Sequence, residues 1–142
     1  MKKENHEIYF NTRDELTKVH LDDVVYIVSD GNYITIKFKS GRNQTLLASL
    51  QNFLQITETL HDERFVRIGR SHIVNIQYVS QVNNLRRSIT LVDDQMKMTV
   101  ELLVSKEALR QLKQMFAELP RREITDFKTT NGNMKAFQLG ES

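Results

Sequence analysis

Residues 65–75 of this chain read Phe-Val-Arg-Ile-Gly-Arg-Ser-His-Ile-Val-Asn. The segment combines apolar residues that favour strands with two arginines, a serine, a histidine and an asparagine, and it contains no acid. It belongs to an acid-free run from Arg64 to Arg87 that holds five arginines. A core segment does not need this charge bias, whereas a surface that meets phosphates does. The stretch therefore indicates β structure beside a phosphate-binding surface.

The charge is unevenly distributed along the chain. The formal net charge is +2, but residues 1–30 carry four bases and seven acids, residues 31–87 eight bases and three acids, and residues 88–142 eight of each. The middle of the chain is thus the basic part. An excess of this size is also common on ordinary solvated surfaces, so charge alone favours nucleic acid only mildly.

Length and composition restrict the class of protein. The 142 residues suffice for one domain with its own core. The absence of cysteine excludes disulfides, thiolate metal sites and cysteine nucleophiles. No apolar run approaches the roughly 18 residues that a membrane span needs, and the polar residues 1–6 lack the apolar core of a signal peptide. We therefore expect a cytoplasmic protein with no membrane partner.

Alternating apolar and polar residues predict strands over most of the first hundred residues. The predicted strands are Glu7–Phe10, Leu16–Leu21, Val24–Val28, Tyr33–Lys39, Gln44–Leu47, Phe65–Ile68, Val79–Asn83, Ser88–Val92 and Met96–Leu103. Turn residues predict hairpin turns at Ser29–Asn32, at Ser40–Asn43 and at Asp93–Asp94.

Two segments change to helical spacing. Residues 50–60 form an apolar stripe that should lie on a sheet, with Ser49 as the N-cap. A second helix is predicted from Ser105, which also caps, to the only proline, Pro120. The tail that follows is polar and mixed, with an exposed turn or linker at residues 129–133. The predicted fold is mainly β, with several antiparallel sheets, one short helix packed on the side and a C-terminal helix.

Four segments together resemble the LytTR family of bacterial DNA-binding domains. They occur in order over residues 7–112, and Val104-Ser105-Lys106 matches a common close of the family pattern. The four segments are Leu21–Ile27, Asp30–Tyr33, Leu47–Leu50 and Phe65–Asn75, the last followed by Ile76 and Val79. We therefore predict a LytTR-like domain at residues 1–112, and the rest of the C-terminal helix with a polar tail at residues 113–142. The receiver domain and membrane helices that often accompany the family have no counterpart here, which leads us to expect a stand-alone domain.

The resemblance implies an all-β domain that inserts loops into successive major grooves of a bent duplex and binds repeats cooperatively. The first loop position falls on Asn32 or Tyr33, the second on Arg70, and the third on Ser105 or Lys106. The chain also departs from the pattern. Family members often have histidine or asparagine where this chain has glycine and arginine at 69 and 70. An acid at 107 stands where a second base is common.

Each predicted contact has an ordinary structural alternative. Arg70 can reach guanine O6 and N7 through its planar fork, or be a surface arginine beside a turn; we favour the DNA contact. Arg67 either contacts phosphate or covers a sheet face with its stem. Asn32 pairs with adenine or only makes the turn. Tyr33 touches DNA or packs across strands.

The remaining candidates are supporting contacts. Lys37, which shares a strand face with Lys39, and Arg42 in the next turn would extend a basic track. Ser105 and Lys106 either form an ordinary helix start or bind a phosphate there. Two further arginines at 86–87 make a hairpin turn or a phosphate clamp.

Two residues of the opening stretch are assigned to structure. Asn75 should satisfy backbone groups between two strands. His72 is interpreted as a satisfied core or edge histidine rather than a ligand. The other histidines, at positions 6, 20 and 61, lack metal-ligand spacing.

The predicted function is sequence-specific binding of double-stranded DNA by a transcriptional regulator, with promoter repeats as the target. A glycine-rich phosphate loop, a serine-histidine-acid set and a paired-carboxylate site are absent from the sequence, so we expect no enzymatic activity, cofactor or metal. The alternative is a protein-interaction or dimerisation module. Separately, we hypothesise a homodimer contact through the C-terminal helix, by the stripe Leu109, Leu112, Met115 and Phe116.

Overall fold

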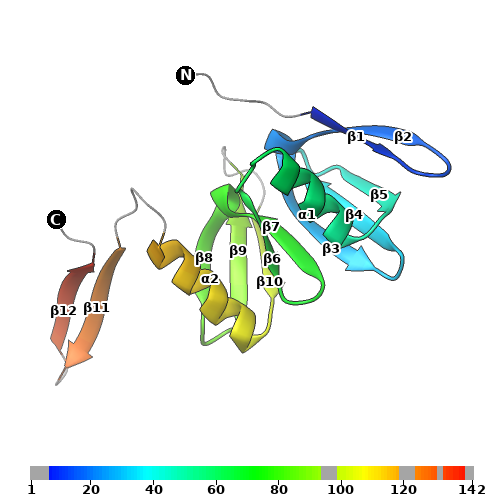
Figure 1. The fold of residues 1–142 in the computed structure, drawn as a ribbon. Helices are drawn as coiled ribbons and strands as arrows, with labels where there is room; N and C mark the ends of the chain where they lie inside the picture. Colours follow the sequence, from blue (N-terminus) through cyan, green and yellow to red (C-terminus); the bar gives the residue numbers. More distant parts are fainter. Residues whose placement is uncertain (1–6, 94–98, 119–123, 131–132, 140–142) are drawn as a thin grey trace. The chain divides into compact units, whose positions relative to one another are not determined.

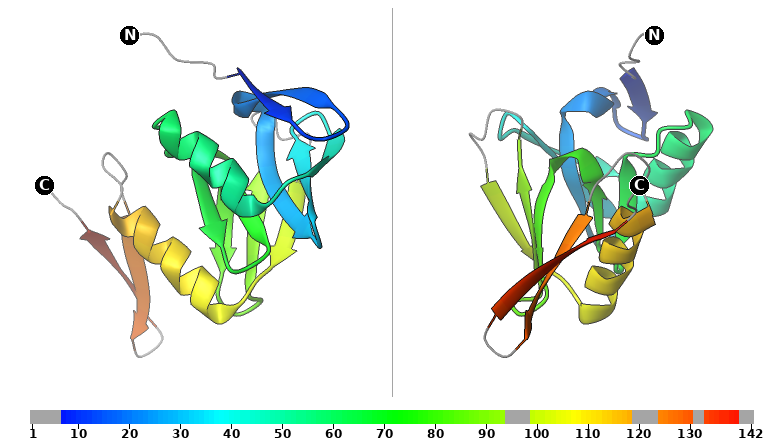
Figure 2. Two further views of the ribbon diagram at one scale, coloured as in Figure 1. Left: turned by 45° about the vertical axis from the view of Figure 1, so that its right-hand side comes forward. Right: turned by 90° about the vertical axis from the view of Figure 1, so that its left-hand side faces the viewer.

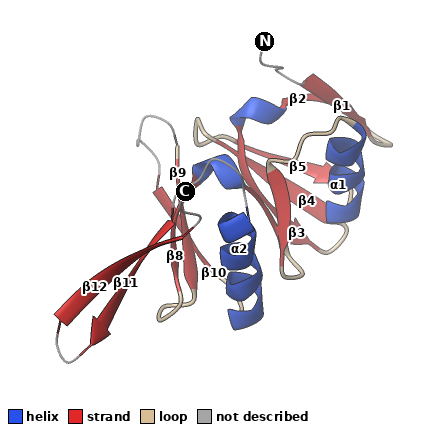
Figure 3. Cartoon of the chain, turned by 60° about the vertical axis from the view of Figure 1, so that its left-hand side comes forward, coloured by secondary structure: helices blue, strands red, loops and turns tan. Residues whose placement is uncertain are grey.

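The chain is mainly β in the part that the computed structural model describes, residues 7–93, 99–118, 124–130 and 133–139 (Figure 1). Its strands pair antiparallel throughout these ranges, and two α-helices accompany them (Figure 3). This confirms the predicted fold class. The chain divides into two compact units, Met1–Leu109 and Arg110–Ser142. The predicted boundary at residue 112 remains a prediction.

The largest sheet of the first unit has the strand order β5-β4-β3-β7-β6. Its strands are β3 Val24–Asp30, β4 Tyr33–Phe38, β5 Asn43–Leu47, β6 Phe65–Ile68 and β7 His72–Asn75. Sequence patterning did not predict β7. The adjacent residues Ile73 and Val74 are both fully buried, so both faces of this strand are covered. A strand covered on both faces shows no alternation, and its periodicity signal disappears.

Helix α1, Leu50–Thr59, lies along one face of this sheet (Figures 1 and 2). It begins with a capping box in which the Ser49 hydroxyl accepts from the Asn52 N–H at 3.0 Å and the Ser49 N–H donates to the Asn52 side chain at 2.9 Å. Phe53 is fully buried, with its ring centroid 6.0 Å from that of Phe10 and 5.3 Å from that of Phe65. The predicted helix and its cap are confirmed, and the helix anchors the sheet from which the turns below project.

Two smaller sheets complete the first unit. One pairs β1, Glu7–Asn11, with β2, Leu16–His20, and a 3₁₀ turn, Leu21–Asp23, follows it. The other has the order β10-β9-β8 and is reached from β7 through a 3₁₀ turn, Ile76–Tyr78. Its strands are β8 Val79–Asn83, β9 Ser88–Val92 and β10 Thr99–Leu103. Asp94 of the predicted last hairpin turn and residues 96–98 of the predicted last strand lie outside the described residues.

Helix α2, Lys106–Glu118, confirms the predicted C-terminal helix. Of its apolar stripe, Leu109 and Leu112 are already buried in the single chain, and Met115 and Phe116 are half-buried. A homodimer through this helix remains a prediction. Within the described ranges, neither helix is long and apolar enough to cross a bilayer.

The polar tail contains two strands that the sequence patterning did not predict, and three residues of the predicted turn or linker, 129, 130 and 133, belong to them. Strands β11, Ile124–Thr130, and β12, Asn133–Leu139, pair antiparallel in register from Thr130↔Asn133 to Ile124↔Leu139. The predicted turn residues 131–132 lie outside the described residues. Hairpin pairing is made by backbone groups, so polar strands adopt it when the turn allows. The Asn-Gly dipeptide at 131–132 is a strong sequence signal for a hairpin.

Candidate nucleic-acid interface

The turn between β3 and β4 presents the first predicted contact. Asp30 pairs with Tyr33, which leaves a two-residue turn of Gly31 and Asn32. Gly31 has φ +65°, a conformation that costs glycine little and lets so short a hairpin close. Asn32 is exposed, and Tyr33 is half-exposed opposite Leu47 of β5. Tyr33 is therefore compatible with both interpretations, packing across strands and contact with DNA, because it has a cross-strand neighbour and a solvent-facing surface.

The turn between β6 and β7 presents the second contact. Ile68 pairs with His72, so Gly69, Arg70 and Ser71 form the turn, and Gly69 has φ +66°. The Arg67 guanidinium donates to the Arg70 carbonyl oxygen at 3.1 Å and braces the turn from within. The Arg70 side chain is exposed and makes no hydrogen bond or ion pair with the part of the chain that the structure describes. The backbone of Arg70 is thus fixed by a hydrogen bond, whereas its guanidinium has no partner among the described residues.

These two turns lie at the same end of the five-stranded sheet. Strands β3 and β7 are neighbours, with Val28 opposite His72. The backbone N–H of Ser29 donates to the carbonyl oxygen of Ser71 at 2.9 Å. Because the pairing runs up to the turns themselves, it brings Asn32 and Arg70 to one end of the sheet although they are 38 positions apart in the sequence.

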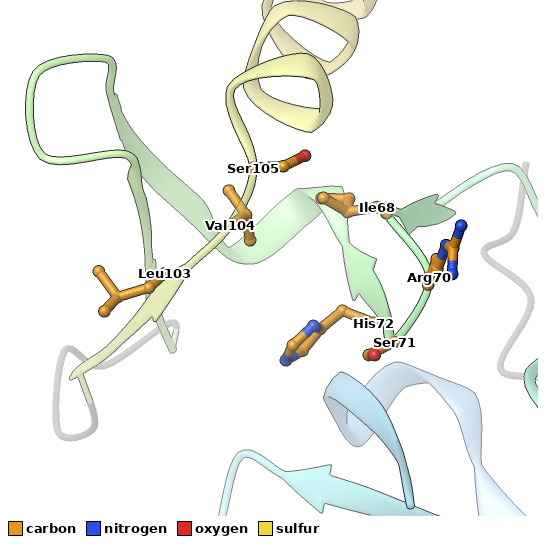
Figure 4. Close-up of a pocket in the computed structure, with 8 residues that line it drawn as sticks. Ile68, Arg70, Ser71, His72, Leu103, Val104 and Ser105 are labelled. Atoms are coloured by element: carbon orange, nitrogen blue, oxygen red, sulfur yellow. The ribbon is translucent and has the colours of Figure 1, made fainter.

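The third predicted contact, at the junction of β10 and α2, faces the second turn across a hollow of about 360 Å³ (Figure 4). Arg70, Ser71 and His72 lie on one side of the hollow, and Leu103, Val104 and Ser105 on the other. Its lining is Ile68, Gly69, Arg70, Ser71, His72, Leu103, Val104 and Ser105. We call the two turns, residues 31–32 and 69–71, together with the junction, residues 104–106, the loop edge.

Ser105 and Lys106 begin helix α2. The Ser105 hydroxyl accepts from the Ala108 N–H at 3.1 Å, which confirms the predicted cap and leaves the hydroxyl hydrogen available to donate. Lys106 is the first residue of the helix and is exposed. A positive charge at a helix N-terminus opposes the helix dipole, so this lysine is poorly placed for helix stability. A nearby phosphate would reverse that penalty.

Two of the predicted contacts lie elsewhere. Lys37 pairs with Asn43 at the end of β4 away from Tyr33, and Arg42 lies in the turn beyond it. The Arg42 guanidinium stands over the Phe38 ring, 4.5 Å from its centroid. Contact of Lys37 and Arg42 with DNA remains a prediction, and the length of β4 separates both residues from the loop edge.

The arginines of the acid-free run have different partners. Arg64 binds Asp62 at 2.6 Å and Asp22 at 2.7 Å, and the hydrogen bond with Asp62 raises the pKa of its guanidinium. Arg86 binds Glu101 at 3.0 Å. None of these acids lies within the run. The charge of the run alone therefore predicts a larger cationic surface than the structure has. In the folded chain, acids from outside the run form ion pairs with two of its arginines.

Asn75 has the structural role predicted for it. It is fully buried, its side-chain amide donates to the Val24 carbonyl oxygen at 2.9 Å, and its side-chain oxygen accepts from the Gln77 N–H at 3.0 Å. These bonds satisfy the amide between β3 and the 3₁₀ turn that follows β7. The residue belongs to the scaffold.

His72 lies half-buried at the hollow, with its ring centroid 6.5 Å from that of Tyr26. Burial lowers the pKa of His72, because the charged imidazolium loses hydration in the fold. The unfolded chain then binds the proton more readily. The contribution of His72 to stability is complete above its unfolded pKa of about 6.5 and is lost as the pH falls through the lower folded value.

We expect the free energy of unfolding to fall between about pH 7 and pH 5, and to fall less in His72→Gln. Urea denaturation of both proteins at the two pH values measures this difference. The other titrating groups are common to both proteins and cancel in the comparison. If the free energy of unfolding had the same pH dependence in the two proteins, burial of His72 would not be the cause of that dependence.

Comparison with known proteins places the chain in a family. The LytTr DNA-binding domain matches residues 14–117, and the chain belongs to this family. It is similar to two proteins of Paraburkholderia xenovorans (strain LB400). The heme-containing CO-sensing transcriptional regulator RcoM 1 is 29% identical over 103 residues, which cover 72% of this chain and 37% of that protein. RcoM 2, of the same description, is 31% identical over 97 residues, covering 68% and 34%.

A solved structure has the same fold. It is the LytTr DNA-binding domain of a putative methyl-accepting/DNA response regulator from Bacillus cereus, with a TM-score of 0.55 at 20% identity. The match covers 80% of this chain and 97% of that one. The chain spans about a third of the length of the two curated relatives.

Proposed function

We propose that this chain binds double-stranded DNA at specific sequences through the loop edge and acts in transcriptional regulation. The observation that carries the proposal is the meeting of two turns and the β10–α2 junction, which are distant in sequence, at one end of the fold. The Ser29–Ser71 hydrogen bond joins the first two, and the hollow between Arg70 and Ser105 joins the second and third. Membership of the LytTr family and the description of two relatives as transcriptional regulators support it.

In the proposed mechanism, the turns enter successive major grooves and side chains from them read bases. The planar fork of Arg70 suits guanine O6 and N7, and the amide of Asn32 suits adenine N6 and N7. Rigid strands hold both turns, which limits the entropy lost when the side chains bind. Bending of the duplex would add indirect readout at base pairs that the protein does not touch.

The other predicted residues at this end anchor the sugar-phosphate backbone. Lys106 and the Ser105 hydroxyl would meet a phosphate at the start of α2, where free backbone N–H groups also favour an anion. Tyr33 would contact the backbone from the first turn. Arg67 retains donors beyond the one that it gives to the Arg70 carbonyl oxygen, so it can brace the turn and bind phosphate together.

Selection of bound duplexes from a random pool, followed by salt titration of the enriched duplex, tests the proposal. We expect enrichment of a short repeated motif. We also expect log K to fall linearly with log salt, with a slope of about −0.9 for each phosphate contact. A pool with no enriched motif, or affinity that hardly changes with salt, would refute the function.

A further inference from the structure

We infer that the turn between β8 and β9, residues 84–87, is a fourth DNA-contacting element, in which Arg87 binds the phosphate backbone. The inference rests on the proposed function and extends it, because none of the three family loop positions falls on this turn. From the sequence, a hairpin turn was the favoured interpretation of the arginine pair at 86–87, and a phosphate clamp was the alternative.

The turn adjoins the loop edge. The carbonyl oxygen of Arg87 accepts from the backbone N–H of Val104 at 2.9 Å. Val104 belongs to the β10–α2 junction and lines the hollow opposite Arg70. A duplex that reaches both sides of this hollow therefore passes beside the β8–β9 turn.

The turn is open to solvent and fixed in shape. Its four residues, Asn84, Leu85, Arg86 and Arg87, are all exposed, Leu85 to 94%. The Asn83 side-chain oxygen accepts from the Arg86 N–H at 3.0 Å and closes the turn. The ladder between β8 and β9 continues up to Asn83↔Ser88. A turn held from both sides has little backbone entropy left to lose on binding.

The two arginines of the turn differ in what they already bind. The Arg86 guanidinium lies against Glu101, with its closer oxygen at 3.0 Å. The Arg87 side chain makes no hydrogen bond or ion pair with the described residues. Of the five arginines in the acid-free run, Arg64 and Arg86 bind acids and Arg67 braces a turn within the described structure. Arg70 and Arg87 keep their guanidinium groups uncommitted, and they flank the same junction.

Local conformation does not explain an arginine at position 87. Its φ is +54°, a left-handed conformation that costs free energy for any residue with a Cβ and that glycine or asparagine would adopt more readily. The side chain is exposed and does not contribute to the core in return. An unpaired cation on a strained turn beside a DNA-reading edge fits a phosphate, which accepts a bidentate guanidinium.

The test compares Arg87→Gln and Arg87→Lys with the unaltered chain by fluorescence anisotropy, on the duplex enriched from the random pool and on a scrambled duplex. Glutamine removes the charge and keeps a similar backbone strain. We expect Arg87→Gln to weaken binding about 3- to 10-fold on both duplexes and to reduce the salt slope by about one. Arg87→Lys should restore most of the slope, because lysine also binds phosphate as a point charge.

Arg13→Gln is the matched control, since Arg13 is an exposed arginine in the β1–β2 turn and its loss changes the net charge equally. Thermal unfolding confirms that each variant folds. A salt slope and affinity equal to those of Arg13→Gln would overturn the inference while leaving DNA binding intact. A loss confined to the enriched duplex would overturn it too, because that result identifies a base contact. Failure of the unaltered chain to bind either duplex would instead refute the proposed function.

Discussion

Replacement of Arg70 by alanine is expected to weaken binding to the target duplex by roughly 5- to 150-fold, or about 1–3 kcal/mol, and binding to random DNA much less. The reason is geometric. The strands on both sides and the Arg67 hydrogen bond fix the backbone of the turn, and the Arg70 guanidinium is free of partners among the described residues. Its fork can then meet a guanine edge without breaking a bond within the protein.

Arg70→Lys separates base reading from charge. Lysine keeps the positive charge but has no planar fork, so we expect it to retain most of the affinity for random DNA and to lose discrimination against it. Arg13→Ala controls for the change in net charge. Competition binding with target and random duplexes measures both affinities in one experiment. Equal losses on the two duplexes would refute base reading by Arg70.

Replacement of Arg64 by methionine should destabilise the fold by about 3 kcal/mol and leave the DNA affinity of the folded protein unchanged. The side chains of Arg64 and Asp62 are only 21% and 4% exposed. Loss of the guanidinium removes its hydrogen bonds and its positive charge from two partly desolvated carboxylates, those of Asp62 and Asp22. Urea denaturation at neutral pH measures the free energy of unfolding.

Arg86→Met is the comparison for Arg64→Met. The Arg86–Glu101 pair has the same chemistry, but its side chains are 64% and 38% exposed, and exposed pairs contribute about 0–1 kcal/mol. The two variants should therefore differ by about 2 kcal/mol or more. Equal losses of stability would contradict the distinction between Arg64, whose ion pair is partly buried and stabilises the fold, and Arg86, whose ion pair is exposed.

Much of the scaffold could be predicted from local patterns. The capping box before α1, the turn at Gly31-Asn32 and the alternation along β4 all act over a few neighbouring residues, so the sequence displays them directly. Strand β7 and the terminal hairpin were missed for opposite reasons. One is buried on both faces and has no alternation, and the other is a polar hairpin formed by backbone pairing.

The candidate site, unlike the scaffold, depends on contacts between residues that are distant in sequence. The family pattern named Asn32, Arg70 and Ser105 one by one, but nothing in the linear order shows that their turns meet. Antiparallel pairing of β3 with β7 brings the first two together, and the packing of the β10–α2 junction brings the third. The same packing adds Arg87, whose carbonyl oxygen is bonded to that junction.

Local patterns predict most of the β scaffold, its helices and the residue types that can read DNA, because periodicity, capping and turn chemistry act between near neighbours. Which cations remain without an acid partner depends instead on contacts between residues distant in sequence. Arg64 and Arg86 bind acids from outside their run, Arg67 bonds to the carbonyl oxygen of its own turn, and Arg70 and Arg87 are left beside one junction. Partners distant in sequence determine the free charge of a surface, and only folding brings such partners within bonding distance.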